Sequence, residues 1–274
     1  MELPFDEILV PLDGSRLAER ALAPALELVE RIGVPLRLVS RALPGEEEEL
    51  ASYLAGLADR HADVTDVETS VEERDAIPSA IAANVGGGTL VCMSTHGHSG
   101  PVRVLIGSVA SALLRAIDVP ALVVGPKVPD PATIGDGRIV ACLDGSHLAE
   151  RTVEPAHRWS RALGLPLWLV QVVPPGLEVE ERTHGDVSEG AYLAGLAASV
   201  GEVTGWDVLH DTDPADAIVA MDGRDPVAVL VLATRGRSGW SRLALGSVTS
   251  TVMREATVPV LVVPAGREPD TASL

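Results

Sequence analysis

Two segments of the chain combine small residues and glycines with a closing Gly-Ser pair at the same spacing. The first, residues 94–108, reads S-x-x-G-x9-G-S, and the second, residues 233–247, reads A-x-x-G-x9-G-S. Glycines let backbone N–H groups converge, and the Gly-Ser pair opens a predicted helix whose N-terminus carries about half a positive charge. This chemistry favours an anion. The residues are Ser94, His96, Gly97, His98, Gly100, Gly107, Ser108 and Val109, and Ala233, Arg235, Gly236, Arg237, Gly239, Gly246, Ser247 and Val248.

Carboxylates are missing around both segments, although Asp and Glu supply 39 of the 274 residues. None occurs in residues 76–117 or 226–254. Binding a polyanion requires such a gap, although buried strands and an Ala-rich helix would also lack charge. The net charge of −18 argues against nucleic acid and anionic membranes as partners. Because Lys127 is the single lysine, a G-x-x-x-x-G-K-[ST] phosphate loop is absent.

The chain is an internal duplication. Residues 8–22 match residues 139–153 at an offset of 131, and residues 94–111 match residues 233–250 at an offset of 139. Each copy has the size of an ordinary domain. We therefore expect a first domain over 1–128, a linker over 129–135, a second domain over 136–267 and a flexible tail over 268–274.

Each copy alternates apolar strand runs with helical patterns. In the first copy, strands are predicted at 7–12, 35–39, 66–71, 89–94 and 119–124, and helices after Ser15 and at 46–62, 77–85 and 108–117. Ser15 and Ser146 are expected N-caps, and Gly33 and Gly164 expected helix stops. Pro24 and Pro155 fall inside a predicted helix, where we expect a kink. The order predicts an α/β fold with a five-stranded parallel sheet covered by helices on both faces in each copy.

In such a sheet, ligands bind beyond the carboxyl ends of the strands. The sequence Asp-Gly-Ser follows the first strand of both copies, at Asp13 and Asp144. Both aspartates are candidates for a ligand site, and the alternative is that they are turn residues. Ser108 and Ser247 likewise have two interpretations, as phosphate contacts or as plain helix caps.

Both copies contain a DGS turn, a THGHSG or TRGRSG segment with a late Gly-Ser, and a last strand VPALVV or VPVLVV. Together these motifs resemble the universal stress protein family in its tandem form. The resemblance covers essentially the whole chain, twice. It implies two Rossmann-like domains with strand order 3-2-1-4-5, which pair through their fifth strands. In one branch of the family it implies ATP, with or without magnesium, on a G-x-x-G-x9-G-[ST] loop. It also implies a homodimer.

The residues that bind ATP in that branch of the family are only partly matched in this sequence. In the ATP-binding branch, an acid facing the ribose and adenine is matched by Asp13 and Asp144. The preceding proline is matched by Pro11 but replaced by Cys142. A valine that touches adenine is matched by Val172, whereas the first copy has Arg41. The first loop glycine is Ser94 or Ala233. These departures suggest that the two sites are unequal.

Other chemistries fit less well. His96 and His98 form an H-x-H, but arginines replace them in the second copy, which argues against zinc. No G-x-S-x-G elbow and no G-x-G-x-x-G after the first strand is present. Cys92 and Cys142 lie in apolar runs and indicate core packing.

The sequence therefore predicts a cytoplasmic protein that binds ATP in a regulatory, largely non-catalytic way in one or both domains. The alternative is a nucleotide-independent scaffold or interaction protein of the same fold, favoured by Ser94, Ala233, Cys142 and Arg41. An enzyme is the least favoured class, because no general base is placed by the sequence, although slow ATP hydrolysis is compatible with the site.

Overall fold

The computed structural model describes residues 3–73, 77–95, 106–175, 190–221, 225–234 and 245–264. The elements of the first half follow each other as strand and helix in alternation, and the second half repeats them. The first half contains β1 (Glu7–Leu12), α1 (Arg16–Glu19), α2 (Leu22–Ile32), β2 (Leu36–Arg41), α3 (Glu47–His61), β3 (Val67–Glu72), α4 (Ile77–Ala82), β4 (Thr89–Ser94), α5 (Ser108–Ala116) and β5 (Ala121–Val124). The second contains β6 (Arg138–Leu143), α6 (His147–Glu150), α7 (Val153–Leu163), β7 (Leu167–Val173), α8 (Ala191–Val200), β8 (Gly205–His210), α9 (Pro214–Val219), β9 (Val227–Ala233), α10 (Ser247–Glu255) and β10 (Val260–Val263).

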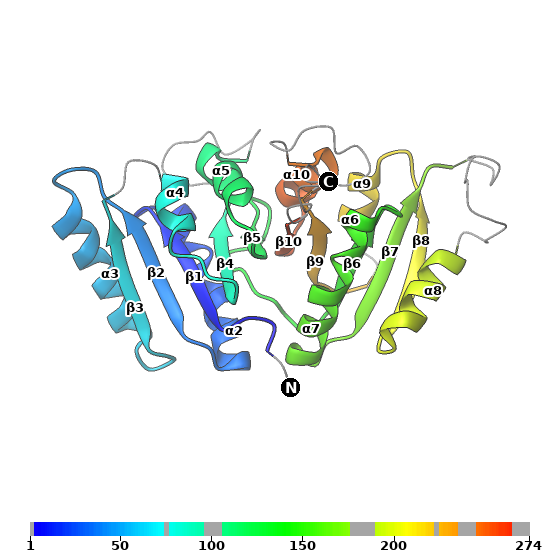
Figure 1. The fold of residues 1–274 in the computed structure, drawn as a ribbon, viewed down its shortest axis with the longest axis horizontal. Coiled ribbons are helices and arrows are strands. Elements are labelled where there is room, and N and C mark those ends of the chain that lie inside the picture. The colour runs from blue at the N-terminus through cyan, green and yellow to red at the C-terminus, as the bar shows by residue number, and fades with distance from the viewer. Residues whose placement is uncertain are drawn as a thin grey trace, which may run out of the picture.

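Within these residues the strands form one ten-stranded sheet in the order β3-β2-β1-β4-β5-β10-β9-β6-β7-β8. Each half is parallel and has the expected order 3-2-1-4-5. The halves join where β5 and β10 pair antiparallel, with Leu122 opposite Leu261. Figure 1 shows this junction in the middle, with β3 and β8 at the two outer ends. The expected pairing through fifth strands therefore occurs within one chain.

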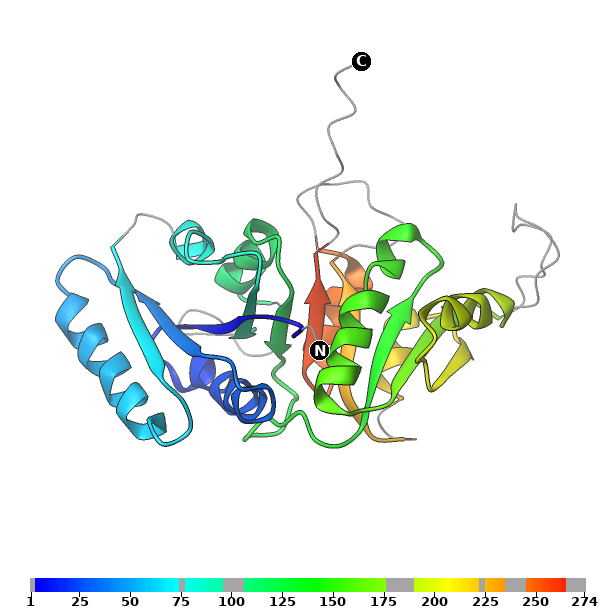
Figure 2. The ribbon, with the colours of Figure 1, turned by 60° about the horizontal axis from the view of Figure 1, so that its bottom comes forward.

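Two apolar cores lie on opposite faces of this sheet because alternate strand residues point to opposite sides. Ile8 and Val10 face the core formed with α2, α3, α7 and α8, whereas Leu9 faces the core formed with α4, α5, α9 and α10. Each core contains residues of both halves, and α2 contacts α7. Figure 2 shows the helices distributed over the two faces of the sheet.

The helix after the first strand differs from the expectation. It is two helices, α1 and α2, because the chain leaves the helical pattern at Arg20 and Ala21. Pro24 is therefore the third residue of α2, where the missing N–H would have no partner within the helix in any case. Pro155 has the same place in α7. The expected mid-helix kink was wrong, and the proline is a first-turn residue.

The segment between the halves packs against the first half. Val128, Ala132 and Ile134 are buried, and the Ile134 N–H donates to Glu27 Oε2 at 2.7 Å. Arg20 donates to the carbonyls of Gly125 and Val128. Gly125 also approaches α10 so closely that an added Cβ would lie on the Met253 carbonyl. The connection thus contacts both halves.

Candidate functional site

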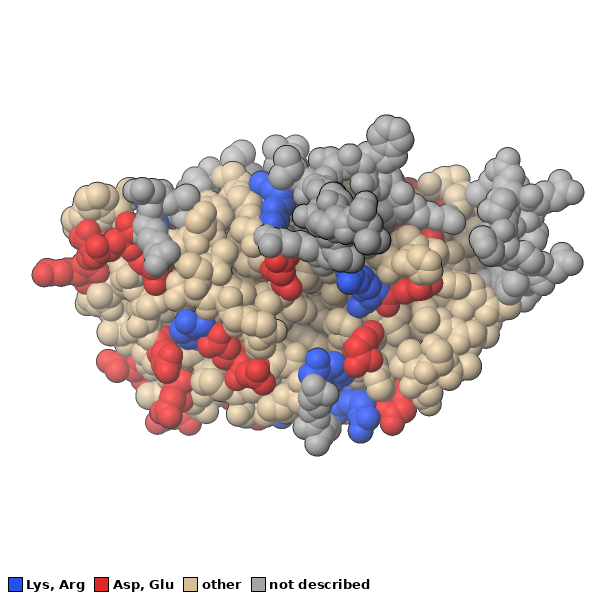
Figure 3. Space-filling model, in the orientation of Figure 1, with Lys and Arg blue, Asp and Glu red and all other residues tan. Residues whose placement is uncertain are grey.

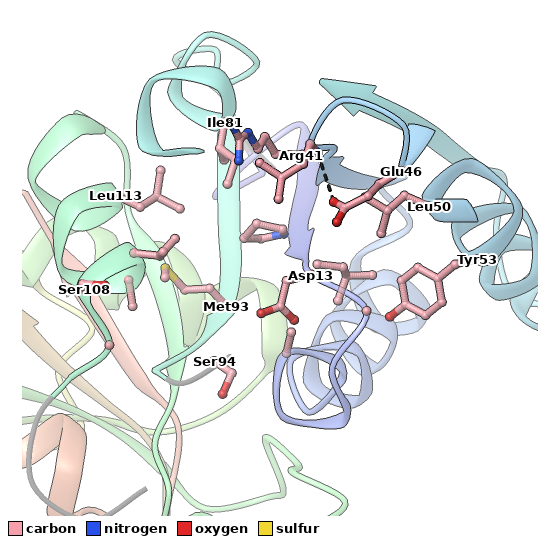
Figure 4. A pocket seen from close by; sticks show the side chains of 18 of the residues that line it. Asp13, Arg41, Glu46, Leu50, Tyr53, Ile81, Met93, Ser94, Ser108 and Leu113 are labelled. Carbon is pink, nitrogen blue, oxygen red and sulfur yellow. Dashed lines mark hydrogen bonds between the residues drawn. The ribbon is translucent and has the colours of Figure 1, made fainter. Parts of the chain in front are cut away.

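A cleft of about 620 Å³ opens at the carboxyl ends of β1, β2 and β4 in the first half. Here the strand order reverses, since β1 lies between β2 and β4. Figure 4 shows residues of α5 on one side of the cleft and residues of α3 on the other. The volume is that of an ordinary small-molecule site. The lining residues are Pro11, Leu12, Asp13, Gly14, Ala18, Arg41, Leu43, Glu46, Glu49, Leu50, Tyr53, Ile81, Met93, Ser94, Thr95, Gly107, Ser108, Val109, Ala110 and Leu113.

The Asp-Gly-Ser turn is built in the same way in both halves. Asp13 Oδ1 accepts hydrogen bonds from the backbone N–H of Ser15 at 3.0 Å and from its hydroxyl at 2.6 Å. Ser15 Oγ in turn accepts from the N–H of Ala18, which makes Ser15 the N-cap of α1, as the sequence predicts. Gly14 has a φ of 79°, which a side chain would strain. Asp13 is therefore a turn residue and also lines the cleft.

In the second half, Asp144 Oδ1 accepts from Ser146 N–H at 2.9 Å and from Ser146 Oγ at 2.6 Å. Gly145 has the same φ of 79°. Ser146 caps α6 through the Ala149 N–H, again as predicted. The two turns therefore present equivalent aspartates after β1 and β6.

The long loop after the fourth strand is closed at its base by a backbone hydrogen bond in both halves. The Gly107 N–H donates to the Thr95 carbonyl at 2.8 Å, and the Gly246 N–H donates to the Thr234 carbonyl at 2.8 Å. Both loops therefore begin and end at fixed, adjacent points. The predicted site residues His96, Gly97, His98 and Gly100, and Arg235, Gly236, Arg237 and Gly239, lie outside the described residues.

The helix that follows each loop starts one residue earlier than a serine cap requires. Gly107 is the N-cap of α5 and makes no side-chain cap hydrogen bond, and Ser108 is the first helical residue. Gly246 and Ser247 have the same places in α10. The interpretation of these serines as plain caps was therefore wrong. In the first half, the N-terminal turn of α5 borders the cleft through Gly107, Ser108 and Val109, where backbone N–H groups without intrahelical partners favour an anion.

A tyrosine on the outer wall of the cleft was missed by the sequence argument. The Tyr53 hydroxyl on α3 donates to Glu19 Oε1 at 2.8 Å. Burial and then this hydrogen bond raise the pKa of the Tyr53 phenol above its ordinary value. In the second half, the Tyr192 hydroxyl donates to Glu150 Oε1 at 3.0 Å. Since Tyr53 and Tyr192 are 139 residues apart and the two glutamates 131, the repeat itself carried the signal.

The halves differ at the end of the second strand. Arg41 ends β2 and lines the cleft of the first half, whereas Val172 has its place in β7 and packs against the core on the α9 and α10 face. Pro11 and Ser94 also line the first cleft. Their counterparts Cys142 and Ala233 lie at the ends of β6 and β9 and are buried.

Charge is unevenly distributed around the two halves. Helix α3 carries Glu47, Glu48 and Glu49 in its first turn, whereas α8 (Ala191–Val200) contains no charged residue. Figure 3 shows acidic side chains gathered over the end of the molecule that carries α3 and β3. Glu46 and Glu49 belong to the lining of the first cleft, and Glu46 Oε2 accepts from the Leu43 N–H at 3.1 Å. The outer rim of this cleft is therefore acidic.

Fold and cleft together define a duplicated, doubly wound α/β protein whose halves pair through their fifth strands. The family model of the universal stress protein family matches residues 4–125 and 137–264. The chain belongs to the universal stress protein family. No helix among its described residues is long and apolar enough to cross a membrane.

Individual relatives agree with this membership. A curated universal stress protein of Mycobacterium tuberculosis (strain ATCC 25618 / H37Rv) is 28% identical over 184 residues, which cover 63% of this chain and 61% of the relative. The match thus spans less than two thirds of that relative. A solved universal stress protein from Archaeoglobus fulgidus DSM 4304 covers 95% of this chain and 99% of its own, with a TM-score of 0.73 at 21% identity. A putative universal stress protein from Pseudomonas aeruginosa UCBPP-PA14 covers 95% and 93%, with a TM-score of 0.70 at 20% identity. These structures show the fold.

Proposed function

We propose that this protein binds ATP, in a regulatory and largely non-catalytic way, at the carboxyl ends of the first and fourth strands of one or both halves. One observation carries the proposal. The N-terminal turn of α5 and the carboxylate of Asp13 border the same cleft, which extends between apolar side chains. A nucleotide needs these three environments, because it has an anionic end, a sugar with hydroxyl donors and a flat apolar base.

Electrostatics support the phosphate end of the proposed site. The gap in carboxylates over residues 76–117 includes β4, α5 and the loop between them. The acidic residues of the cleft come instead from the turn after β1 and from the start of α3. Hence the dipole of α5 meets no nearby carboxylate from its own segment, and the phosphates would lie against Ser108 and Val109.

A regulatory role is favoured over catalysis because two acids of the cleft, Asp13 and Glu46, accept hydrogen bonds within the protein. Asp13 Oδ1 accepts two hydrogen bonds from Ser15, and Glu46 accepts from the Leu43 N–H. Neither arrangement presents an obvious general base. The nucleotide-independent scaffold stays the second candidate, favoured by Ala233 and Cys142 in the second half. The cytoplasmic location, the further homodimer and the domain boundaries stay predictions.

The test is calorimetric titration of the purified full chain with ATP, with and without magnesium, beside the variants Gly107→Asp and Gly246→Asp. Both glycines have backbone angles that any residue adopts, with φ of −51° and −59°, so a carboxylate can be placed there without backbone strain. Each variant sets a negative charge at the start of one helix and should abolish binding in that half. The matched control is Gly87→Asp, because Gly87 is exposed, has no atom within 4 Å of an added Cβ and precedes the amino end of β4.

We expect ATP binding that Gly87→Asp leaves unchanged and that the double variant Gly107→Asp/Gly246→Asp loses. Absence of ATP binding by the unaltered protein would overturn the proposal. So would a double variant that binds like the unaltered protein. A nucleotide-free chain that retains a specific protein partner would favour the scaffold instead.

A further inference from the structure

The first cleft contains a cation at a position where the second half has an aliphatic residue. Among the described residues that line the cleft, Arg41 is the one Lys or Arg. The equivalent residue, 131 positions later, is Val172. The two residues have the same register in the sheet. Ser40 pairs with Leu12 and Gln171 pairs with Leu143, and Arg41 and Val172 are the residues that follow. The difference therefore lies in the side chain and not in the scaffold.

The cleft has two chemically different ends, and Arg41 lies at the end away from the predicted phosphates. In Figure 4, Arg41 and Ile81 are at one end, Ser94 is at the other, and Asp13 points into the space between them. The side chains of Ile81, Met93 and Leu113 supply apolar lining. With phosphates at α5 and the sugar at Asp13, a nucleotide would place its flat base between these apolar residues and direct an edge toward Arg41.

The guanidinium group of Arg41 discriminates between purine edges because it has only hydrogen-bond donors. Guanine presents two acceptors side by side, O6 and N7, which match the planar fork of an arginine. Adenine presents N7 beside an amino group, so one of the two arginine donors would face another donor. A site whose two polar donors both find acceptors on one ligand binds more weakly a ligand that leaves one donor without an acceptor.

A second phosphate at this end is disfavoured by the charges around it. Glu46 and Glu49 line the cleft on the α3 side, near the end of β2. Figure 4 shows Glu46 at the same end as Arg41. A dianionic phosphate would be repelled by these carboxylates, whereas a neutral base edge would not. The local charge thus favours a neutral group with two acceptors as the partner of Arg41.

We propose that the cleft of the first half selects a guanine nucleotide, with Arg41 donating to O6 and N7 of the base, and that the second half, with Val172, lacks this selection. The inference rests on the proposed function, since it requires a nucleotide in the cleft, and it makes guanine, in place of adenine, the preferred base of the first half. Arg41 is then a specificity-determining residue of the first half alone.

The experiment measures GTP and ATP affinities by calorimetry on the full chain. The variant Gly246→Asp leaves the first half as the competent one, and Gly107→Asp leaves the second. In the Gly246→Asp background, Arg41→Val installs the residue of the other half. Arg41→Lys keeps the positive charge but loses the planar fork. Melting temperatures of all variants show whether they remain folded.

We expect GTP to bind the first half about tenfold more tightly than ATP, in line with a good bidentate base contact. Arg41→Val should remove this preference and Arg41→Lys should reduce it, while ATP affinity stays within about twofold. The second half should show no preference for GTP. ATP binding to the first half as tightly as GTP, with a ratio that Arg41→Val leaves unchanged, would overturn the inference while the proposed function stands.

Two further results would also contradict it. If Arg41→Val weakens GTP and ATP equally, Arg41 contacts a phosphate and not the base. If neither nucleotide binds to Gly246→Asp while Gly107→Asp, in which the second half is unaltered, still binds one, the first half is no nucleotide site. Binding by neither half would overturn the proposed function itself.

Discussion

In both halves an Asp-Gly-Ser turn follows the first strand, and its aspartate accepts two hydrogen bonds from the serine. In both, a Gly N–H closes the loop after the fourth strand, and the helix beyond it begins with serine. The halves differ in sequence at the ends of two strands. At the end of the second strand the first half has Arg41 and the second half Val172, and at the end of the first strand they have Pro11 and Cys142.

This difference separates two functions of a nucleotide site, which are to hold the phosphate and sugar and to recognise the base. The repeated elements are those that would meet phosphate and sugar, which every nucleotide shares. Of the unequal residues, Arg41 and Val172 lie where a base would distinguish one nucleotide from another. One duplicated scaffold can therefore hold the same class of ligand twice and still differ in which member it prefers.

The largest effect is expected from the core residues that occupy equivalent places in α2 and α7, Leu28 and Trp159. Both are buried, and Trp159 also packs against Phe5 of the first half, with ring centroids 5.8 Å apart. Trp159→Ala should lower the free energy of unfolding by about 3–5 kcal/mol and Leu28→Ala by about 2–5 kcal/mol.

Chemical denaturation measures both changes. Because Trp159 contacts the first half, Trp159→Ala should shift the unfolding of both halves together. The control is Trp206→Ala on β8, where the residue is 41% exposed and the loss should be clearly smaller than for Trp159→Ala. Equal losses for Trp159→Ala and Trp206→Ala would contradict the packing described.

The next effect concerns the aspartates of the two turns. Asp13→Ala and Asp144→Ala remove the acceptor of the Ser15 and Ser146 hydrogen bonds, which should cost about 0.5–1.5 kcal/mol of stability each. Nucleotide affinity in the altered half should fall about tenfold, because the charged acceptor for the sugar hydroxyls is lost.

Asp13→Asn separates the two roles of this residue. The amide oxygen still accepts from Ser15, so the turn and the stability should remain while the affinity falls. Calorimetry measures the nucleotide affinity, and thermal unfolding measures the stability. Unchanged nucleotide affinity in Asp13→Asn and Asp144→Asn would show that these aspartates are turn residues alone.

The two thiols, Cys92 in the first half and Cys142 in the second, predict a loss of stability at alkaline pH. Burial raises the pKa of the Cys92 thiol well above its usual range and that of Cys142 to about 12. The protonated thiols are therefore favoured in the folded state. Their contribution is fully present below the unfolded pKa of about 8.5 and is lost as pH rises toward the folded values.

Between pH 8 and pH 9.5 we expect each thiol to remove about 1 kcal/mol from the free energy of unfolding. Urea unfolding at a series of pH values measures the slope. Cys92→Ala and Cys142→Ala should each flatten it, at the expense of some stability at every pH. A slope that neither substitution alters would exclude the thiols as its source.

The smallest effect should be the same in both halves. Tyr53→Phe and Tyr192→Phe each remove one hydrogen bond, to Glu19 and to Glu150, and should lower stability by about 0.5–1 kcal/mol. Thermal unfolding measures this. A clear loss for Tyr53→Phe beside none for Tyr192→Phe would show that the repeat of this contact has no energetic counterpart.

Much of the fold could be predicted because local chemistry and global fold agree. Gly33 and Gly164 end their helices in the left-handed region, with φ of 80° and 66°, as their positions indicate. The alternation of apolar runs fixed the order of the elements. The break between α1 and α2 was missed, because neither Arg20 nor Ala21 is a helix breaker; at this break Arg20 donates to the Gly125 carbonyl.

The site was predictable in part for the same reason. Turn and loop residues such as Asp13 and Ser108 carry a spacing that the repeat makes visible. The apolar lining from Ile81, Met93 and Leu113 carries none, since these side chains read as core until the helices are placed against the sheet. The signal for Tyr53 was its repetition as Tyr192 at an offset of 139, while its partner Glu19 is repeated as Glu150 at an offset of 131.

The most direct test of the central claim, that this chain holds nucleotides in its clefts, is mass spectrometry of the small molecules released when freshly purified protein is denatured. We predict a purine nucleotide, at no more than one per half, with guanine nucleotide released from Gly246→Asp and lost in Gly246→Asp/Gly107→Asp. Protein that releases no nucleotide, and that binds neither ATP nor GTP when these are added, would contradict the account.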